Sequence, residues 1–186
     1  MTADNTLLNL HRLVWTALMA ALVAVGAYLH LTIGPVPISL QTLFVILAGF
    51  VLGPKHGTMA IGLYLLAGAV GLPVFAGGKA GIGHLFGPTG GFLFGFALSA
   101  WVAGLGTAGK PDADWKRLSL YGLAASLGTF ALGIPWLKMT LDFTWGKTLS
   151  VGMIPFLPGM VLKLVAVVLA YRFLAKSGLL RRIGQP

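Results

Sequence analysis

The sequence predicts an all-helical membrane protein with six transmembrane helices and both ends of the chain on the cytoplasmic side. Composition is the first reason: 57% of the 186 residues are hydrophobic and 9% are charged, whereas a typical soluble domain has about 25% charged residues. The mean hydropathy of +0.90 agrees with this. The second reason is that apolar runs suited to a hydrocarbon core of about 30 Å recur along the chain. We therefore expect a lipid bilayer around the protein and no separate soluble domain.

Helix breakers separate the first three apolar runs. Gly34-Pro35-Val36-Pro37 ends the first run, because prolines cannot continue a helix. Gly53-Pro54-Lys55 ends the short second run, where breakers and a charge coincide. The third run gives way to a glycine-rich apolar segment from Pro73 to Thr89, which we expect to form a long loop on the outer side.

Charged residues separate the last three runs. The fourth run ends before Lys110. The segment from Lys110 to Arg117 is the markedly polar connection of the chain. A loop with three charged residues precedes Pro158-Gly159, where the sixth run begins, and proline suits the first turn of a helix. We expect one integral membrane domain over residues 1–186, with spans at about 13–33, 39–53, 57–72, 90–109, 117–137 and 157–175 and an outer loop at 73–89.

Basic residues set the expected orientation, because Lys and Arg gather in the cytoplasmic loops of membrane proteins. With both termini inside, the basic residues of the outer loops are Lys79, Lys138 and Lys147. The inner set has nine members: Arg12, Lys55, Lys110, Lys116, Arg117, Arg172, Lys176, Arg181 and Arg182. This excess predicts cytoplasmic termini.

Several classes of chemistry find no support in the sequence. There is no Cys, so disulfides, thiolate metal sites and redox pairs are excluded. Paired carboxylates within a helix, an HExxH motif and a phosphate-binding GK[ST] loop are also missing. The net charge of +9 fits the cytoplasmic ends of membrane helices better than a nucleic-acid surface. We expect no enzyme, cofactor, metal ion or nucleic-acid partner, and an external energy source for any transport.

Polar residues at membrane depth indicate a pocket that opens outward, since such groups are costly in lipid and usually face a cavity or partner. Lys163 has two interpretations. It follows Pro158-Gly159 by about one turn, where its ammonium adds to the positive end of the helix and favours an anion or carbonyl. It can equally extend to the outer interface, as Lys does readily. The residues that outline the pocket are His30, Gln41, Thr42 and Lys163, with Lys79 and His84 in the loop above.

Aromatic residues on the same side also have two interpretations. They can cover the pocket, or they can form the aromatic belt of a membrane interface. An apolar pocket with a few polar groups suits a small, partly hydrophobic solute rather than a metal ion. The aromatic residues are Phe75, Phe86, Phe92, Trp136 and Trp145.

Four ordered motifs form a more specific pattern: GPVPISLQTL at 34–43, LAG with GPK at 47–55, GLPVFAGG at 71–78 and GPTGGF at 87–92. Together they resemble the BioY proteins, which are the biotin-binding S components of energy-coupling factor (ECF) transporters. The resemblance extends from about Leu13 to Ala175.

The resemblance implies a six-helix bundle of the ECF S-component type, a multi-pass protein of a prokaryotic cytoplasmic membrane that captures biotin from outside. It also implies a transmembrane coupling subunit (EcfT-like) and ATP-binding-cassette ATPase subunits as partners, which agrees with the missing phosphate-binding loop. Small residues on the first helix of such proteins dock on the coupling subunit. Ala17 and Ala21 match that pattern, and Ala20 and Ala24 offer a second register.

One position departs from the family pattern. The family's sixth helix opens with a Pro-Gly-Asp-x-x-Lys-like signature that helps to hold the ureido ring of biotin, and here Lys163 is kept while Met160 stands in place of the acid. A thioether accepts hydrogen bonds only weakly, whereas a carboxylate accepts them well. Another acceptor such as Gln41 or a loop carbonyl can serve the ring, or the affinity is low, or the sequence is altered.

The sequence therefore predicts high-affinity capture and membrane transport of biotin, with the lipid bilayer as surroundings. The alternative is a small-solute transporter or membrane scaffold of related fold that no longer binds biotin. The candidate ligand-binding residues are Gln41, Lys79, His84, Met160 and Lys163.

Overall fold

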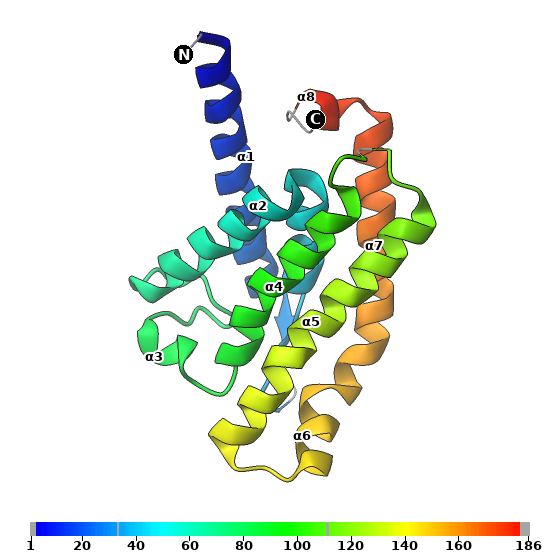
Figure 1. Ribbon diagram of the computed structural model, residues 1–186. Helices are drawn as coiled ribbons and strands as arrows, with labels where there is room; N and C mark the ends of the chain where they lie inside the picture. The colour runs from blue at the N-terminus through cyan, green and yellow to red at the C-terminus, as the bar shows by residue number, and fades with distance from the viewer. Residues whose placement is uncertain (1–2, 33, 111, 183–186) are drawn as a thin grey trace.

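The computed structural model describes residues 3–32, 34–110 and 112–182, and nearly all of this chain is helical (Figure 1). The elements in chain order are α1 (Ala3–Tyr28), β1 (His30–Leu31), β2 (Ile38–Ser39), α2 (Gln41–Ala69), α3 (Ile82–Leu85), α4 (Gly90–Thr107), α5 (Trp115–Leu141), α6 (Trp145–Gly152), the 3-10 helix η1 (Ile154–Phe156), α7 (Leu157–Lys176) and α8 (Leu179–Arg182). The all-helical fold class predicted from the sequence is confirmed.

Among the described residues, five helical stretches are long and apolar enough to cross a membrane: Leu10–Tyr28, Gln41–Ala69, Gly90–Thr107, Trp115–Leu141 and Trp145–Lys176. The sequence predicts six spans. The two numbers differ because the second and third expected runs are the two halves of α2, which meet at a break without a loop between them and so count as one stretch.

Helix α2 is broken at Gly53, where the predicted second run ends. Gly53 has φ 74° and ψ 179°, a left-handed conformation that glycine adopts without steric penalty, and Pro54 follows it. Helix α4 approaches closely here, since a Cβ on Gly104 would lie 2.3 Å from the Pro54 nitrogen. From this break the second half of α2 runs obliquely back toward α3 (Figure 1).

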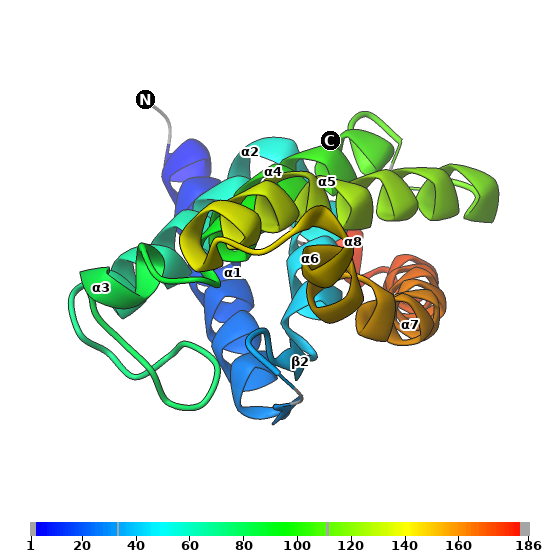
Figure 2. The same ribbon diagram turned by 90° about the horizontal axis from the view of Figure 1, so that it is seen from below.

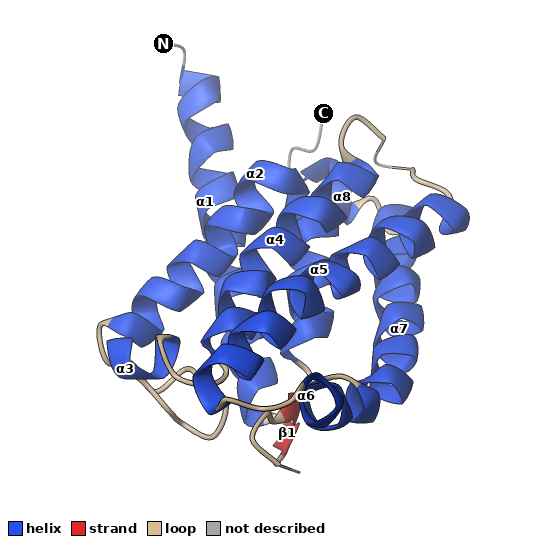
Figure 3. Cartoon of the chain, turned by 60° about the horizontal axis from the view of Figure 1, so that its bottom comes forward, coloured by secondary structure: helices blue, strands red, loops and turns tan. Residues whose placement is uncertain are grey.

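Helix α4 packs against both α2 and α5, and α1 packs against α2. Helices α1 and α7 lie on the same side of the α4–α5 pair (Figure 2). The start of α1 and helix α8 lie at one end of the molecule, whereas the β1–β2 hairpin, α3 and α6 lie at the opposite end (Figure 3). Connections distant in sequence thus meet at the end opposite the termini.

The connections at that end have more structure than the sequence indicated. Tyr28 donates a hydrogen bond to the Pro73 carbonyl, and Phe75, with no exposed surface, fixes the 73–89 loop beneath the helices. In the segment expected as a loop after the fifth run, Thr144 caps α6 by accepting a hydrogen bond from the Lys147 amide at 3.4 Å. A Thr at the N-cap is favourable because its oxygen satisfies a free amide of the first turn.

Candidate functional site

A cavity lies at the end of the molecule opposite the termini, where separate parts of the chain converge. Together with its open mouth it contains about 790 Å³ of space free of protein atoms. Its lining comes from the hairpin, α2, the 73–89 loop, α4, α5, η1 and α7: Val36, Pro37, Ser39, Gln41, Thr42, Ile46, Ala76, His84, Thr89, Phe92, Leu93, Phe96, Ser126, Thr129, Phe130, Phe156, Met160 and Lys163.

Three aromatic rings give the cavity its apolar wall. Phe92 of α4 stacks on Phe156 of η1 with ring centroids 6.5 Å apart and planes 18° from parallel. Phe130 of α5 packs edge-on against both, at 6.4 and 6.2 Å. Because the rings come from three elements, the wall exists only when these elements pack together. This wall suits an apolar ring or chain of a ligand.

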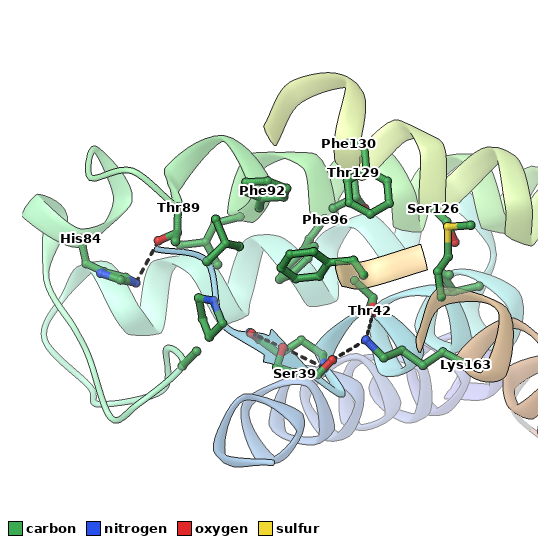
Figure 4. Close-up of a pocket in the computed structure, with 18 residues that line it drawn as sticks. Ser39, Thr42, His84, Thr89, Phe92, Phe96, Ser126, Thr129, Phe130 and Lys163 are labelled. Atoms are coloured by element: carbon green, nitrogen blue, oxygen red, sulfur yellow. Dashed lines mark hydrogen bonds between the residues drawn. The ribbon is translucent and has the colours of Figure 1, made fainter. Parts of the chain in front are cut away.

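Lys163 reaches inward from the second turn of α7. Its Nζ donates a hydrogen bond to the Ser39 carbonyl at 2.6 Å and lies 3.2 Å from the Thr42 hydroxyl, so it joins α7 to the junction of β2 and α2 (Figure 4). This is not the geometry of a lysine extended to the membrane surface. A cation held with two neutral partners retains a third N–H for a carbonyl or anionic group.

Gln41, the first residue of α2, is buried next to the partners of Lys163. Its side-chain nitrogen donates to the Tyr64 hydroxyl at 2.5 Å, and its Oε1 accepts from the Ser39 hydroxyl at 3.0 Å. The side chain is therefore fixed in direction before any ligand enters. A fixed amide contributes to binding at a small entropy cost.

His84 and Thr89 lie at the other end of the cavity in the view of Figure 4, with Phe92 and Phe96 between them and Lys163. The His84 Nε2 lies 3.5 Å from the Thr89 hydroxyl, and the ring packs on Phe75 with centroids 5.2 Å apart. Burial first, and then the nearby Lys79 ammonium, lower the pKa of His84 below its ordinary value. His84 is thus a neutral group at pH 7.

The lowered pKa of His84 predicts a pH dependence of stability. The folded state prefers the neutral ring, so this contribution is complete above the ordinary histidine pKa of about 6.5 and is lost as the pH falls below it. We expect the thermal unfolding temperature to fall more steeply between about pH 7 and pH 5 in the parent than in His84→Gln, because only the parent has this ring to protonate. Parallel curves for the two proteins would contradict the prediction.

Four of the five predicted ligand-binding residues line the cavity together: Gln41, His84, Met160 and Lys163. Lys79 is exposed and does not line it. Its expected contact with ligand remains a prediction. The residues that sequence reasoning missed are mostly aromatic or hydroxylic side chains within helices, and the main ones are Phe96, Ser126, Thr129, Phe130 and Phe156.

The aromatic residues at the end of the molecule opposite the termini divide between the two interpretations. Phe75 is fully buried and Phe92 lines the cavity. Trp136 is half-buried and donates to the Gly87 carbonyl at 2.9 Å, which holds the end of the 73–89 loop. Phe86 and Trp145 are 61% and 56% exposed, as residues of an interfacial belt are.

The two alanine registers on α1 face different surroundings. Ala17 and Ala21 are exposed, on a face that they share with the exposed Leu13 and Leu18. Ala20 and Ala24, by contrast, pack into the core with Val23. The first register is therefore available for contact with another protein, and the second serves packing within this chain.

The described residues of the cavity lining include no Asp or Glu, and Lys163 is the one Lys or Arg among them. Neutral donors and one cation beside aromatic rings suit a ligand with carbonyl or anionic groups on an apolar frame. In the described part of the chain no cluster of three potential metal ligands occurs.

Comparisons with known proteins agree on one family. The family model described as "BioY family" matches residues 1–179. The biotin transporter BioY of Thermotoga maritima is 42% identical, with 86% of this chain and 93% of that protein covered. Biotin transporter BioY2 of Lactococcus lactis subsp. cremoris is 38% identical, with 86% and 87% covered.

A solved structure has the same fold. It is the crystal structure of the S-component for biotin from an ECF-type ABC transporter, with a TM-score of 0.83, 28% sequence identity and 95% of each chain covered. The family resemblance predicted from the sequence motifs is confirmed. The chain belongs to the BioY family.

Proposed function

We infer that this chain is the biotin-binding subunit of a transporter. The observation that carries the inference is the cavity itself, in which the Lys163 cation and the Gln41 amide stand beside a wall of three aromatic rings. Biotin has a polar ureido ring fused to an apolar thioether ring, and an alkyl chain that ends in a carboxylate, so such a mixed lining suits it. The family, whose relatives are biotin transporters, supports the same ligand.

Biotin binding to the purified, detergent-solubilised protein tests this function. We expect saturable binding at a one-to-one ratio, measured by isothermal titration calorimetry, and no binding of thiamine, which is a cation and would meet Lys163. Failure to bind biotin, with the protein folded by circular dichroism, would contradict the inference.

We propose further that the chain forms one membrane domain with six crossings and cytoplasmic termini in a prokaryotic cell membrane. The break at Gly53 separates the second and third crossings. The termini-side ends of the helices carry most of the basic residues, as the cytoplasmic side does in membrane proteins. The cavity then opens to the outside, where biotin is captured.

Energy for transport must come from other subunits, and we propose an EcfT-like coupling subunit and ATP-binding-cassette ATPases. The exposed register of Ala17 and Ala21 supports α1 as the docking surface. Small residues permit two helices to approach closely in a membrane.

Lys79, in the exposed part of the 73–89 loop, is a candidate for first contact with the biotin carboxylate.

Ala17→Trp and Ala21→Trp are expected to reduce biotin uptake by about ten-fold while biotin binding to the isolated chain changes by less than about two-fold. A large ring on the exposed face blocks close helix contact but leaves the cavity intact. Uptake by cells and co-purification of the ATPases measure the first effect, and calorimetry measures the second.

The matched control is Leu169→Trp, at a position on α7 that is 63% exposed and away from α1. It should leave both uptake and binding unchanged. Loss of binding together with uptake in the alanine variants would show that α1 acts through packing of the bundle instead.

A further inference from the structure

Tyr64 lies outside the cavity, but its hydroxyl is hydrogen bonded to a residue that lines it. The side chain is 2% exposed, and the hydroxyl accepts a hydrogen bond from the Gln41 side-chain nitrogen at 2.5 Å. Among the described residues of the lining, Gln41 is present and Tyr64 is not. Tyr64 is thus separated from a ligand in the cavity, and it can influence binding only through the residues that it holds.

The bond between these two side chains joins the two halves of α2. Gln41 begins the first half, and Tyr64 belongs to the second half, beyond the break at Gly53. From that break the second half runs obliquely back across the molecule (Figure 1). The bend therefore brings a hydroxyl to an amide that is 23 residues earlier in the sequence.

The Gln41 amide is joined in turn to the residue that holds Lys163. Its Oε1 accepts a hydrogen bond from the Ser39 hydroxyl at 3.0 Å, and the Ser39 carbonyl accepts one from the Lys163 Nζ at 2.6 Å. Ser39 lies in a strand of only two residues, and so short a hairpin has little stability of its own. The hydrogen bonds that run from Tyr64 through Gln41 to Ser39 therefore help to fix the carbonyl that holds the cation.

The amide depends on Tyr64 for its orientation. One end of an amide donates hydrogen bonds and the other accepts them, so its orientation decides what it offers to its neighbours. Without the Tyr64 hydroxyl, the Gln41 nitrogen would lose its partner in a side chain that is 3% exposed. An unpaired buried donor is costly, so the flexible side chain would turn to another acceptor and leave Ser39.

The Tyr64 ring is held by contacts that do not involve its hydroxyl. It packs edge-on against Phe75, with ring centroids 5.6 Å apart and planes at 79°. Phe75 is fully buried against Gly68, one turn after Tyr64, where a Cβ would lie 2.0 Å from the Phe75 ring. Removal of the hydroxyl alone therefore leaves the ring and its packing in place.

We propose that Tyr64 is a positioning residue for ligand binding. Its hydroxyl holds the Gln41 amide, and through Ser39 the Lys163 ammonium, in the arrangement that receives biotin. This role rests on the proposed function. Groups that are already in place lose less entropy when a ligand binds, so the hydroxyl raises the affinity without touching the ligand.

Tyr64→Phe tests the role, because it removes the hydroxyl and keeps the ring. We expect biotin to bind about ten-fold more weakly, measured by equilibrium dialysis with radiolabelled biotin well below the unfolding temperature. The matched control is Tyr171→Phe. Tyr171 is also fully buried and packs on an aromatic ring, Phe50, at 5.6 Å, but it does not line the cavity. This control should bind biotin within about two-fold of the parent, and a loss equal to that of Tyr64→Phe would overturn the role.

A double-mutant cycle shows whether Tyr64 acts through the amide. Gln41→Leu removes the amide and should itself weaken binding about ten-fold, after which Tyr64→Phe should change the affinity by less than about two-fold. A further ten-fold loss in the Gln41→Leu background would mean that Tyr64 acts through Phe75 and the 73–89 loop, and the role would fall. Unchanged binding by Tyr64→Phe would overturn this inference alone, whereas a parent protein that binds no biotin would overturn the proposed function as well.

Discussion

Replacing Lys163 with Met is expected to weaken biotin binding by about 2–3 kcal/mol, roughly 30- to 150-fold. Met keeps the length and apolar stem of the side chain but removes the cation. The Lys163 ammonium bonds to the Ser39 carbonyl and the Thr42 hydroxyl, so it is held in place before the ligand arrives. A hydrogen bond from such a charged donor is about twice as strong as a neutral one.

The comparison needs a control for charge and one for structure. Lys147→Met removes an exposed cation that lies over the Phe143 ring, outside the cavity, and should leave binding unchanged. Thr42→Val removes one partner of Lys163 but keeps the cation, so it should cost less affinity than Lys163→Met. Calorimetric titration of the three variants at one pH measures the effects. Equal affinity of Lys163→Met and the parent would show that the ammonium serves only to hold α7 to β2 and α2.

The fold class is predictable because its signals are local. Apolar length and proline or glycine breakers act within one segment of chain, so the Gly53-Pro54 pair is enough to predict the break in α2. The number of spans is less predictable. The two helical segments of α2 meet directly at Gly53, without a loop between them, so the end of one span and the start of the next are hard to tell from one bent span.

Helix α6 could not be predicted from the sequence, for a different reason. The sequence before it carries charges that resemble a loop, and only the Thr144 cap and a short apolar stretch indicate a helix. Isolated helices this short have little stability of their own. Packing of α6 against α5 therefore decides that it forms, and such contact between elements has no local signature.

Some residues of the candidate site can likewise be predicted from the sequence, and others cannot. Gln41, His84 and Lys163 stand out in the sequence because polar groups at membrane depth are rare, and the cavity unites them. Thr129 and Phe130 give no signal, because hydroxyls and aromatics within apolar helices are ordinary packing residues. Their role depends on which faces of α4 and α5 meet, and that is fixed by close contacts such as Gly95 against Thr129. The ligand contacts themselves remain predictions.

Met160 is the residue for which the family pattern and this chain disagree. It lines the cavity three positions before Lys163, so the two side chains share one face of α7. The described lining holds no carboxylate that could accept the ureido N–H groups of biotin. The acceptor oxygens of the lining are amide, hydroxyl and carbonyl oxygens, and the Gln41 Oε1 already accepts a hydrogen bond from Ser39.

Met160→Asp is therefore expected to tighten biotin binding by about 1.5–3 kcal/mol, roughly ten-fold or more. The Lys163 ammonium on the same helix face favours the ionised carboxylate, which then accepts a ureido N–H in a charge-assisted hydrogen bond. Met160→Asn has nearly the shape of Asp without the charge and should gain less. Titration of the parent and both variants with biotin at one pH decides the question. Equal affinities would mean that another oxygen, such as the Gln41 Oε1 or a backbone carbonyl, already serves the ureido ring. Weaker binding by the Asp variant would mean that the cavity has repacked around the thioether.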